Sequence, residues 1–223
     1  MIVMSTDAEP SDVGPVLTRL VLIRHGESIA NSTQTIHGPR ICGGLSDVGR
    51  EQCERLAERL ARTGELAGGI LYASQFRRAH ETAKLIAPAL GNPEVHIDDG
   101  FGELDWGVDC DGLTWMEILE RHGAPDWDAD PELSIIPGAE PIAAMHRRVT
   151  AAVDRIIDEH RGGLVVVCTH GGAIDVAVRY ALGITGRGQF DLYTTNTSLT
   201  TITDTSWGRW RIERYNDAAH LLA

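Results

Sequence analysis

Two histidines follow two apolar stretches of the sequence in the same way. Residues 20–23 are apolar and lead into Arg24, His25 and a glycine, and the valine-rich residues 164–168 lead into a threonine, His170 and two glycines. A neutral imidazole is a nucleophile, and a cation beside it stabilises an anionic ligand. One Arg-His-Gly triplet after a strand is more often an ordinary loop than a site. The repeated arrangement instead predicts two imidazoles that act on one anionic ligand.

The elements that position these histidines are indicated by the apolar stretches themselves. Short continuous apolar runs are typical of buried parallel strands. The carboxyl ends of such strands border the ligand crevice of an open α/β sheet, so Arg24, His25 and His170 are predicted to meet there. Gly26 permits a sharp turn after the first histidine, and Gly171 permits close approach of an anion.

Five motifs in chain order resemble the histidine phosphatase superfamily, which includes the cofactor-dependent phosphoglycerate mutases. They are Arg24-His25-Gly26-Glu27-Ser28 followed by Asn31, then Leu45-Ser46 with Gly49 and Gln52, then Ser74-Gln75-Phe76-Arg77-Arg78-Ala79 with Glu81-Thr82-Ala83, then Glu103, and finally Thr169-His170-Gly171-Gly172. The resemblance runs from about residue 18 to about residue 203. Five ordered motifs are far more specific than any one of them.

The resemblance implies a role for each of these residues. His25 is the nucleophile that carries the phosphoryl group, and Glu103 first protonates the leaving oxygen and then activates water. The remaining site residues bind the phosphoryl oxygens and stabilise their charge; they are Arg24, Asn31, Arg78, His170 and Gly171. Neighbouring cations are expected to lower the pKa of the nucleophile. This chemistry implies neither a metal nor a cofactor.

Two neighbours compete with these assignments. Arg77 precedes Arg78 at the predicted start of a helix, where the helix dipole disfavours cations. A cation at this position therefore suggests binding of an anion. In the family the arginine of the site stands directly before alanine, so Arg78 is assigned to the site and Arg77 to the surface. Asp105 is the nearest rival of Glu103, although a run of acids is usually a solvated face.

An insertion of about residues 105–138 departs from the family pattern. The Trp-Glu-Gly that commonly follows the catalytic acid is replaced by Asp109-Cys110-Asp111-Gly112 with shifted spacing. Three prolines and Trp127 follow a predicted short helix. Loops of this length often act as lids or binding loops, so the insertion is expected to cap the site.

The fold class predicted for the chain is α/β, a three-layer sandwich with a mostly parallel central sheet flanked by helices. Ser46 is a predicted N-cap, and the 3.6-residue apolar period and strand patterns place helices at 47–62, 76–87, 139–160 and 173–182, strands at 70–73 and 94–97, and a terminal hairpin at 197–203 and 207–215. Residues 1–16 are expected to be a flexible tail and residues 17–223 one domain.

The composition of the chain limits the classes of molecule that it is expected to bind. The net charge of −12 argues against a nucleic-acid partner or an acidic membrane surface, and no apolar run is long enough to cross a membrane. Four cysteines without CxxC spacing, and residues 1–15 without the pattern of a secretory signal, favour reduced thiols in the cytoplasm. A small phosphorylated metabolite is the expected partner, and a homodimer stays open.

The leading function is a phosphatase acting on small phosphomonoesters. A phosphoglycerate mutase shares every catalytic residue but needs further cations for a second phosphate and a carboxylate. Residues 104–117 contain four acids and no lysine or arginine, although His37, Arg40, Arg121 and His122 are placed to compensate in part. A non-catalytic phosphate-binding module is a third alternative, which the intact set of catalytic residues disfavours.

Overall fold

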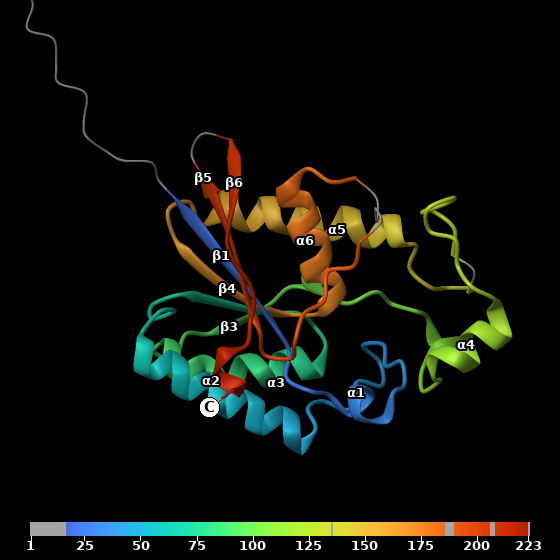
Figure 1. The fold of residues 1–223 in the computed structure, drawn as a ribbon, viewed down its shortest axis with the longest axis horizontal. Coiled ribbons are helices and arrows are strands. Elements are labelled where there is room, and N and C mark those ends of the chain that lie inside the picture. Colours follow the sequence, from blue (N-terminus) through green and yellow to red (C-terminus); the bar gives the residue numbers. More distant parts are fainter. Residues whose placement is uncertain (1–16, 135, 186–189, 206–207, 223) are drawn as a thin grey trace, which may run out of the picture.

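A mixed sheet of six strands forms the centre of the molecule. The computed structural model describes residues 17–134, 136–185, 190–205 and 208–222, so the expected tail at 1–16 lies outside the described residues. The strands lie in the order β3 (Val95–Ile97), β2 (Ile70–Ala73), β4 (Leu164–Thr169), β1 (Thr18–Arg24), β5 (Leu199–Thr205) and β6 (Arg209–Asp217). The first four are parallel, and the last two add an antiparallel hairpin (Figure 1).

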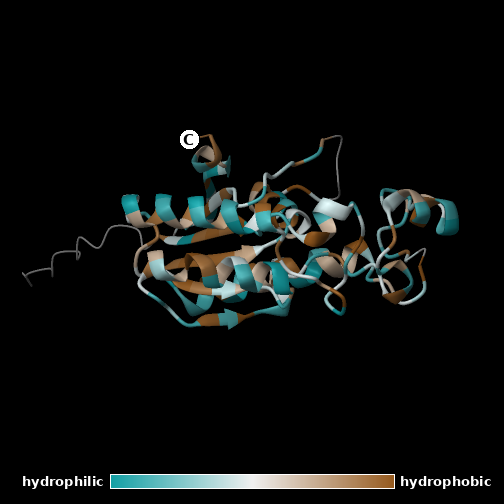
Figure 2. Cartoon of the chain, turned by 90° about the horizontal axis from the view of Figure 1, so that it is seen from below, coloured by the Kyte–Doolittle hydropathy of each residue, from teal (hydrophilic) through white to brown (hydrophobic). Residues whose placement is uncertain are grey.

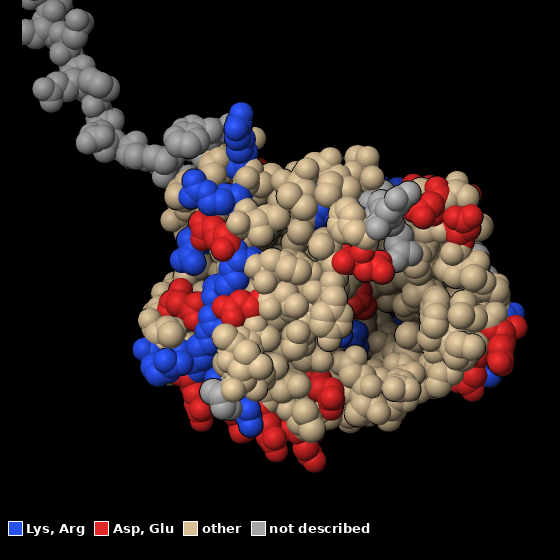
Figure 3. Space-filling view, viewed as in Figure 1, with Lys and Arg blue, Asp and Glu red and all other residues tan. Residues whose placement is uncertain are grey.

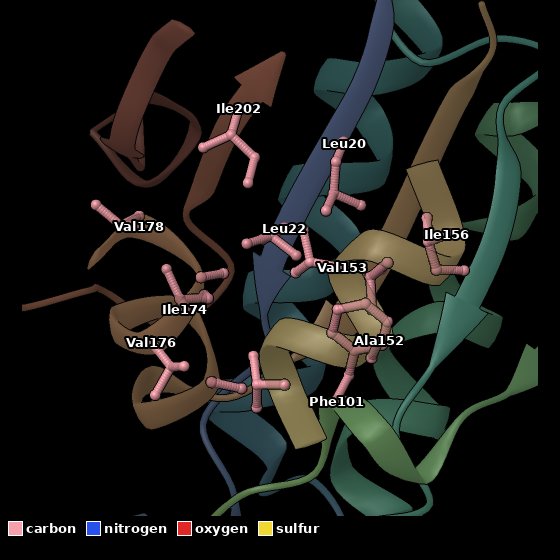
Figure 4. Close-up of a cluster of buried hydrophobic side chains, with 14 of the residues drawn as sticks. Leu20, Leu22, Phe101, Ala152, Val153, Ile156, Ile174, Val176, Val178 and Ile202 are labelled. Carbon is pink, nitrogen blue, oxygen red and sulfur yellow. The ribbon is translucent and has the colours of Figure 1, made fainter. Parts of the chain in front are cut away.

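Helices cover both faces of the sheet. Because successive side chains of a strand point to opposite faces, β1 contributes to both cores. Val21 and Ile23 pack in a cluster with residues of α2 (Asp47–Thr63) and α3 (Arg77–Ile86). Leu20 and Leu22 pack on the other side with α5 (Ile142–Glu159) and α6 (Gly171–Leu182), as Figure 4 shows. Figure 2 shows hydrophobic strands between helices that are largely hydrophilic on their outer sides. The predicted three-layer α/β sandwich is confirmed.

The insertion lies at the far end of the molecule from the hairpin (Figure 1). It contains α4 (Trp115–His122), whose Ile118 packs with Cys110 and Ile136 in a small apolar cluster of its own. The Trp106 ring contacts the rings of Trp115 and Trp127, with centroids 5.1 and 5.8 Å away. The segment that follows Glu103 therefore has a packed core separate from the sheet.

The predicted helices and strands are found, with shifts of a few residues at their ends. The helix predicted from residue 139 begins at Ile142 because Pro141 occupies its N-cap, and a residue before proline disfavours helical geometry. The apolar period of residues 47–62 includes Val48, but this side chain is 50% exposed. The remaining short elements are helix α1 (Ile29–Thr33) and the 3₁₀ turns η1 (Ala87–Leu90), η2 (Asp99–Phe101), η3 (Val108–Cys110) and η4 (Ala219–Leu221).

Within the described ranges, no helix combines the length and the hydrophobicity that crossing a membrane requires.

Candidate active site

The ends of three neighbouring parallel strands bring the predicted site residues together. In the sheet, Arg24 at the end of β1 is level with Thr169 at the end of β4. The His25 amide donates to the Thr169 carbonyl at 2.9 Å, and the Ser74 amide after β2 donates to the Cys168 carbonyl at 3.0 Å. The rings of His25 and His170 consequently lie edge to face with centroids 5.1 Å apart. The shared crevice expected from the two strand ends is present.

The hydrogen bonds of His25 fix which of its ring nitrogens is reactive. Its Nδ1 lies 2.7 Å from the Gly26 carbonyl oxygen, which can only accept, so Nδ1 carries the proton. Its Nε2 accepts a hydrogen bond from Arg78 Nε at 3.1 Å. Burial, and secondly the Arg78 guanidinium, hold the pKa of His25 well below its usual value. His25 is therefore a neutral imidazole whose Nε2 lone pair faces the arginine.

Gly26 serves packing rather than the sharp turn expected from the sequence. It is not among the glycines with positive φ, so any residue could adopt its backbone conformation. A Cβ at this position would lie 2.5 Å from the Gly49 carbonyl oxygen and 2.8 Å from Cys53 Sγ, both on α2. The glycine thus allows the strand end that carries His25 to lie directly against that helix.

Arg78 lies inside the crevice and Arg77 lies outside it. Arg78 is 5% exposed, and its guanidinium lies over the Phe76 ring, 4.4 Å from the centroid. Its NH1 donates to the His37 carbonyl at 3.2 Å, which directs the guanidinium across the site. Arg77 forms a surface ion pair with Glu81 at 2.7 Å. The structure thus places this pair of arginines as the sequence predicts.

Two arginines of the site have no carboxylate partner in the described part of the chain. Arg24 donates to the Thr194 carbonyl, and its buried Nε has no hydrogen-bond partner among the described residues. Arg78 bonds only to neutral groups there. By contrast Arg59, which is similarly enclosed, pairs with both Glu65 and Asp217. Burial lowers the pKa of Arg24 and the charge of Glu103 opposes this effect, but the two described side chains form no ion pair. Two enclosed guanidinium groups beside one carboxylate leave positive charge for an anionic ligand.

His170 is oriented by a serine that the sequence analysis did not assign to the site. Ser74 Oγ accepts from the Phe76 amide and lies 2.6 Å from His170 Nε2, so its hydroxyl proton is available to Nε2. When Ser74 donates to Nε2, the proton of the neutral ring lies on Nδ1, which is buried and has no partner in the described part of the protein. Burial, and then Arg78, lower the pKa of His170 well below its usual value. His170 is thus a neutral hydrogen-bond donor beside His25.

The Glu103 carboxylate lies at the edge of the crevice. Its Oε1 accepts from the Leu104 amide at 3.1 Å and its Oε2 from the Gly172 amide at 3.2 Å. A Cβ on Gly172 would come within 2.3 Å of Oε1, so glycine is required at the start of α6 for this approach. Gly171 in turn borders the guanidinium of Arg24, whose Nε would lie 3.8 Å from a Cβ there.

The rival acid Asp105 is directed away from the crevice. Its two carboxylate oxygens accept from NH1 and NH2 of Arg40, each at 2.9 Å, and these bonds with Arg40 lower the pKa of Asp105. Arg40 also donates to Asp111 at 3.2 Å. Arg40, expected to offer a cation for a second anionic group, is therefore already neutralised.

A cavity of about 210 Å³ is bordered by Arg24, His25, Arg78 and Glu103, whereas His170, which is fully buried behind His25, and Gly171 are not among its lining residues. Figure 3 shows a hollow in this face of the molecule, with basic side chains inside it. Asn31 lines the cavity, but its Oδ1 caps α1 by accepting from the Ser28 amide at 3.1 Å. The lining residues are Arg24, His25, Ser28, Ala30, Asn31, Thr35, Ile36, His37, Arg78, Glu103, Leu104 and Trp106. Two thirds of these residues come from segments 28–37 and 104–106, which the sequence motifs only partly covered.

The described ranges contain no group of three or more histidine, cysteine, aspartate or glutamate side chains that could hold a metal ion.

Comparisons with known proteins agree with this geometry. The family model for the histidine phosphatase superfamily (branch 1) matches residues 20–218. Phosphoglycerate mutase-like protein 4 of Arabidopsis thaliana is 32% identical over 91% of this chain and 86% of its own length. Metal-independent phosphoserine phosphatase of the same plant is 29% identical over 96% and 87%. The structure of Bacillus stearothermophilus YhfR aligns with a TM-score of 0.79 at 28% identity, covering 92% of this chain and 99% of that one. The chain belongs to the histidine phosphatase superfamily.

Proposed function

We propose that this protein is a phosphatase that hydrolyses small phosphomonoesters through a phosphohistidine intermediate on His25. The observation that carries the proposal is a neutral His25 Nε2 beside two arginines that have no carboxylate partner among the described residues. A phosphomonoester carries about two negative charges at neutral pH, which Arg24 and Arg78 can balance. Its transfer depends mainly on positioning and on stabilisation of charge, and this crevice offers both.

In the first step His25 Nε2 attacks phosphorus and the bond from phosphorus to the ester oxygen breaks. Arg24, Arg78 and the Nδ1 proton of His170 hold the phosphoryl oxygens, with Asn31 at the wall of the cavity and Gly171 beside the Arg24 guanidinium. Glu103 gives its proton to the departing oxygen, because an alkoxide is a poor leaving group. The products of this step are the alcohol, phosphohistidine and the Glu103 carboxylate.

In the second step the Glu103 carboxylate takes a proton from water as the water oxygen attacks phosphorus. The bond from phosphorus to His25 Nε2 breaks and inorganic phosphate leaves. Glu103 is then protonated again and His25 is neutral, so the cycle closes. Preformed donors on Arg24, Arg78 and His170 stabilise the developing charge in both steps without rearrangement.

The ion pairs of Arg40 favour the phosphatase over the phosphoglycerate mutase. A mutase must hold a second phosphate and a carboxylate while the first phosphate is transferred, so it needs further cations. Arg40 is already neutralised by Asp105 and Asp111. Ile36, Leu104 and Trp106 give the same cavity an apolar wall. The preferred substrate is thus a small metabolite with one phosphate and little other negative charge.

The deciding assay compares the two activities directly. Hydrolysis of a chromogenic phosphate ester is expected to exceed the interconversion of 3- and 2-phosphoglycerate, measured in the presence of 2,3-bisphosphoglycerate. Mutase turnover far above the hydrolysis of any ester would contradict the phosphatase. Inactivity in both assays over a range of pH would instead favour a non-catalytic phosphate-binding module.

Activity is expected to survive metal chelation. The positive charge needed at phosphorus is available from Arg24 and Arg78, and neutral His170 contributes a hydrogen-bond donor. The check is ester hydrolysis after incubation with EDTA and desalting, compared with an untreated sample. Loss of activity that one divalent ion restores would contradict this expectation.

A cytoplasmic location is part of the proposal. Its support is that all four cysteines are free thiols, and that three of them are buried in the core. Reduced cysteines are the norm in the cytoplasm, whereas secreted proteins usually pair them.

A further inference from the structure

Two side chains hold the whole backbone segment that carries the catalytic acid. Arg148 NH1 donates to the Gly100 and Gly102 carbonyls at 3.1 and 2.9 Å, and its NH2 donates to the Glu103 carbonyl at 3.0 Å. The remaining carbonyl of the segment, that of Phe101, accepts from Thr169 Oγ1 at 2.6 Å. Four consecutive carbonyls therefore depend on side chains of α5 and β4 rather than on a regular helix or sheet.

Arg148 is itself held by Glu140, which also binds the chain beyond the acid. Arg148 Nε and NH2 donate to the two Glu140 carboxylate oxygens at 2.7 and 2.8 Å. The Glu140 amide donates to the Asp105 carbonyl at 2.7 Å, and the Asp105 amide reaches a Glu140 carboxylate oxygen at 3.4 Å. The pair of Arg148 and Glu140 thus fixes the backbone on both sides of Glu103. Such two-sided support restricts where the carboxylate can lie.

Arg148 supports the acid without touching the groups that bind phosphate. It does not line the cavity, and among the described residues its side chain donates only to Glu140 and to the carbonyls of Gly100, Gly102 and Glu103. The contacts of His25 and Arg78 come from other segments. Loss of Arg148 would accordingly move the acid while leaving the nucleophile and the arginines in place.

We propose that Arg148 is a positioning residue for the general acid, which places the Glu103 carboxylate next to the leaving oxygen of the substrate. This inference rests on the proposed role of Glu103 in ester hydrolysis. A displacement of about 1 Å at a reacting group can cost about a hundredfold in rate. The cost should appear only where the leaving group requires a proton.

A matched pair of aryl esters makes this selectivity measurable. For phenyl phosphate, whose leaving group needs protonation, Arg148→Met is expected to lower kcat/KM on the order of a hundredfold. For 2,4-dinitrophenyl phosphate, whose stable phenolate leaves without a proton, the expected loss is less than about fivefold. The ratio kcat/KM reports only the steps up to phosphohistidine formation, so slow hydrolysis of the intermediate does not mask the comparison. Arg148→Lys, which cannot reach all three carbonyls at once, should fall between wild type and Arg148→Met.

Arg59→Met is the matched control for loss of an enclosed, ion-paired arginine. Arg59 pairs with Glu65 and Asp217 away from the acid segment, so its loss should leave the ratio of the two esters at the wild-type value. Thermal unfolding shows which variants remain folded at the assay temperature. Equal losses for both esters, or an unchanged ratio, in a folded Arg148 variant would overturn the proposal.

An independent readout does not require activity. The amides of Leu104 and Gly172 are bound to the Glu103 carboxylate, so their hydrogen exchange should accelerate in Arg148→Met and stay unchanged in Arg59→Met. If wild type hydrolyses neither ester, the proposed function fails by itself. Unchanged exchange of both amides in Arg148→Met would then overturn the positioning role separately.

Discussion

His25→Ala is expected to lower kcat/KM for phosphate esters by at least about four orders of magnitude, because deletion of a covalent nucleophile has effects of this size. Among the imidazole nitrogens of the described site, only His25 Nε2 accepts a hydrogen bond from Arg78. The bond from His25 Nδ1 to the Gly26 carbonyl fixes the orientation of the ring. Alanine provides no atom that can attack phosphorus. Steady-state hydrolysis of 2,4-dinitrophenyl phosphate measures the loss with the greatest dynamic range.

A second histidine provides the control for this experiment. His96 is exposed on β3 and contacts the Tyr72 ring, outside the residues that line the cavity. His96→Ala should therefore retain activity close to wild type. Near-normal turnover by folded His25→Ala would remove His25 from the role of nucleophile.

Arg78→Ala is expected to reduce kcat/KM about a hundredfold to a thousandfold, as loss of a preorganised charge-stabilising donor does elsewhere. The substitution removes the guanidinium that donates to His25 Nε2 at 3.1 Å and that is proposed to bind the phosphoryl oxygens. The same guanidinium is one of the causes that hold the pKa of His25 low. Its removal should raise the pKa of His25 towards the usual value, so the acid limb of the profile of kcat/KM against pH should move to higher pH.

Arg77→Ala is the matched comparison one residue away. Arg77 is exposed and pairs with Glu81 on the surface, so its loss should change kcat/KM by less than about twofold. The two variants remove the same chemical group from adjacent positions of α3. A larger effect at Arg77 than at Arg78 would show that the assignment is shifted by one residue.

The sequence predicted those parts of the fold and site that local pattern determines. The runs at β1 and β4 are continuous and apolar because both faces of these strands are covered, and their parallel pairing brings Arg24 level with Thr169. Ser46 caps α2 through the Gly49 amide, as its place before an amphipathic helix indicates. Two strand ends and five motifs were thus sufficient to bring His25, Arg78, Glu103 and His170 to one crevice.

The remaining features depend on contacts between distant parts of the chain. Ser74 reaches His170 and Arg148 reaches the acid segment across separations of 96 and about 45 residues, which no local period encodes. The ion pairs of Arg40 are equally non-local. The sequence showed Arg40 as a cation available to a ligand, but in the fold it pairs with Asp105 and Asp111. The sequence pattern placed the start of α6 at residue 173, whereas the helix begins at Gly171. The Gly172 amide in this first turn binds Glu103, which is distant in the sequence.

Trapping of the phosphoenzyme is the most direct test of phosphoryl transfer through His25. The enzyme is mixed with 2,4-dinitrophenyl phosphate, quenched in alkaline denaturant within a single turnover, and digested for mass spectrometry. We predict one phosphoryl group on the peptide that contains His25, stable in base, lost in acid, and formed at least as fast as turnover. A phosphoryl group on His170 or on any other residue, or hydrolysis with no phosphoenzyme at any time point, would contradict the mechanism.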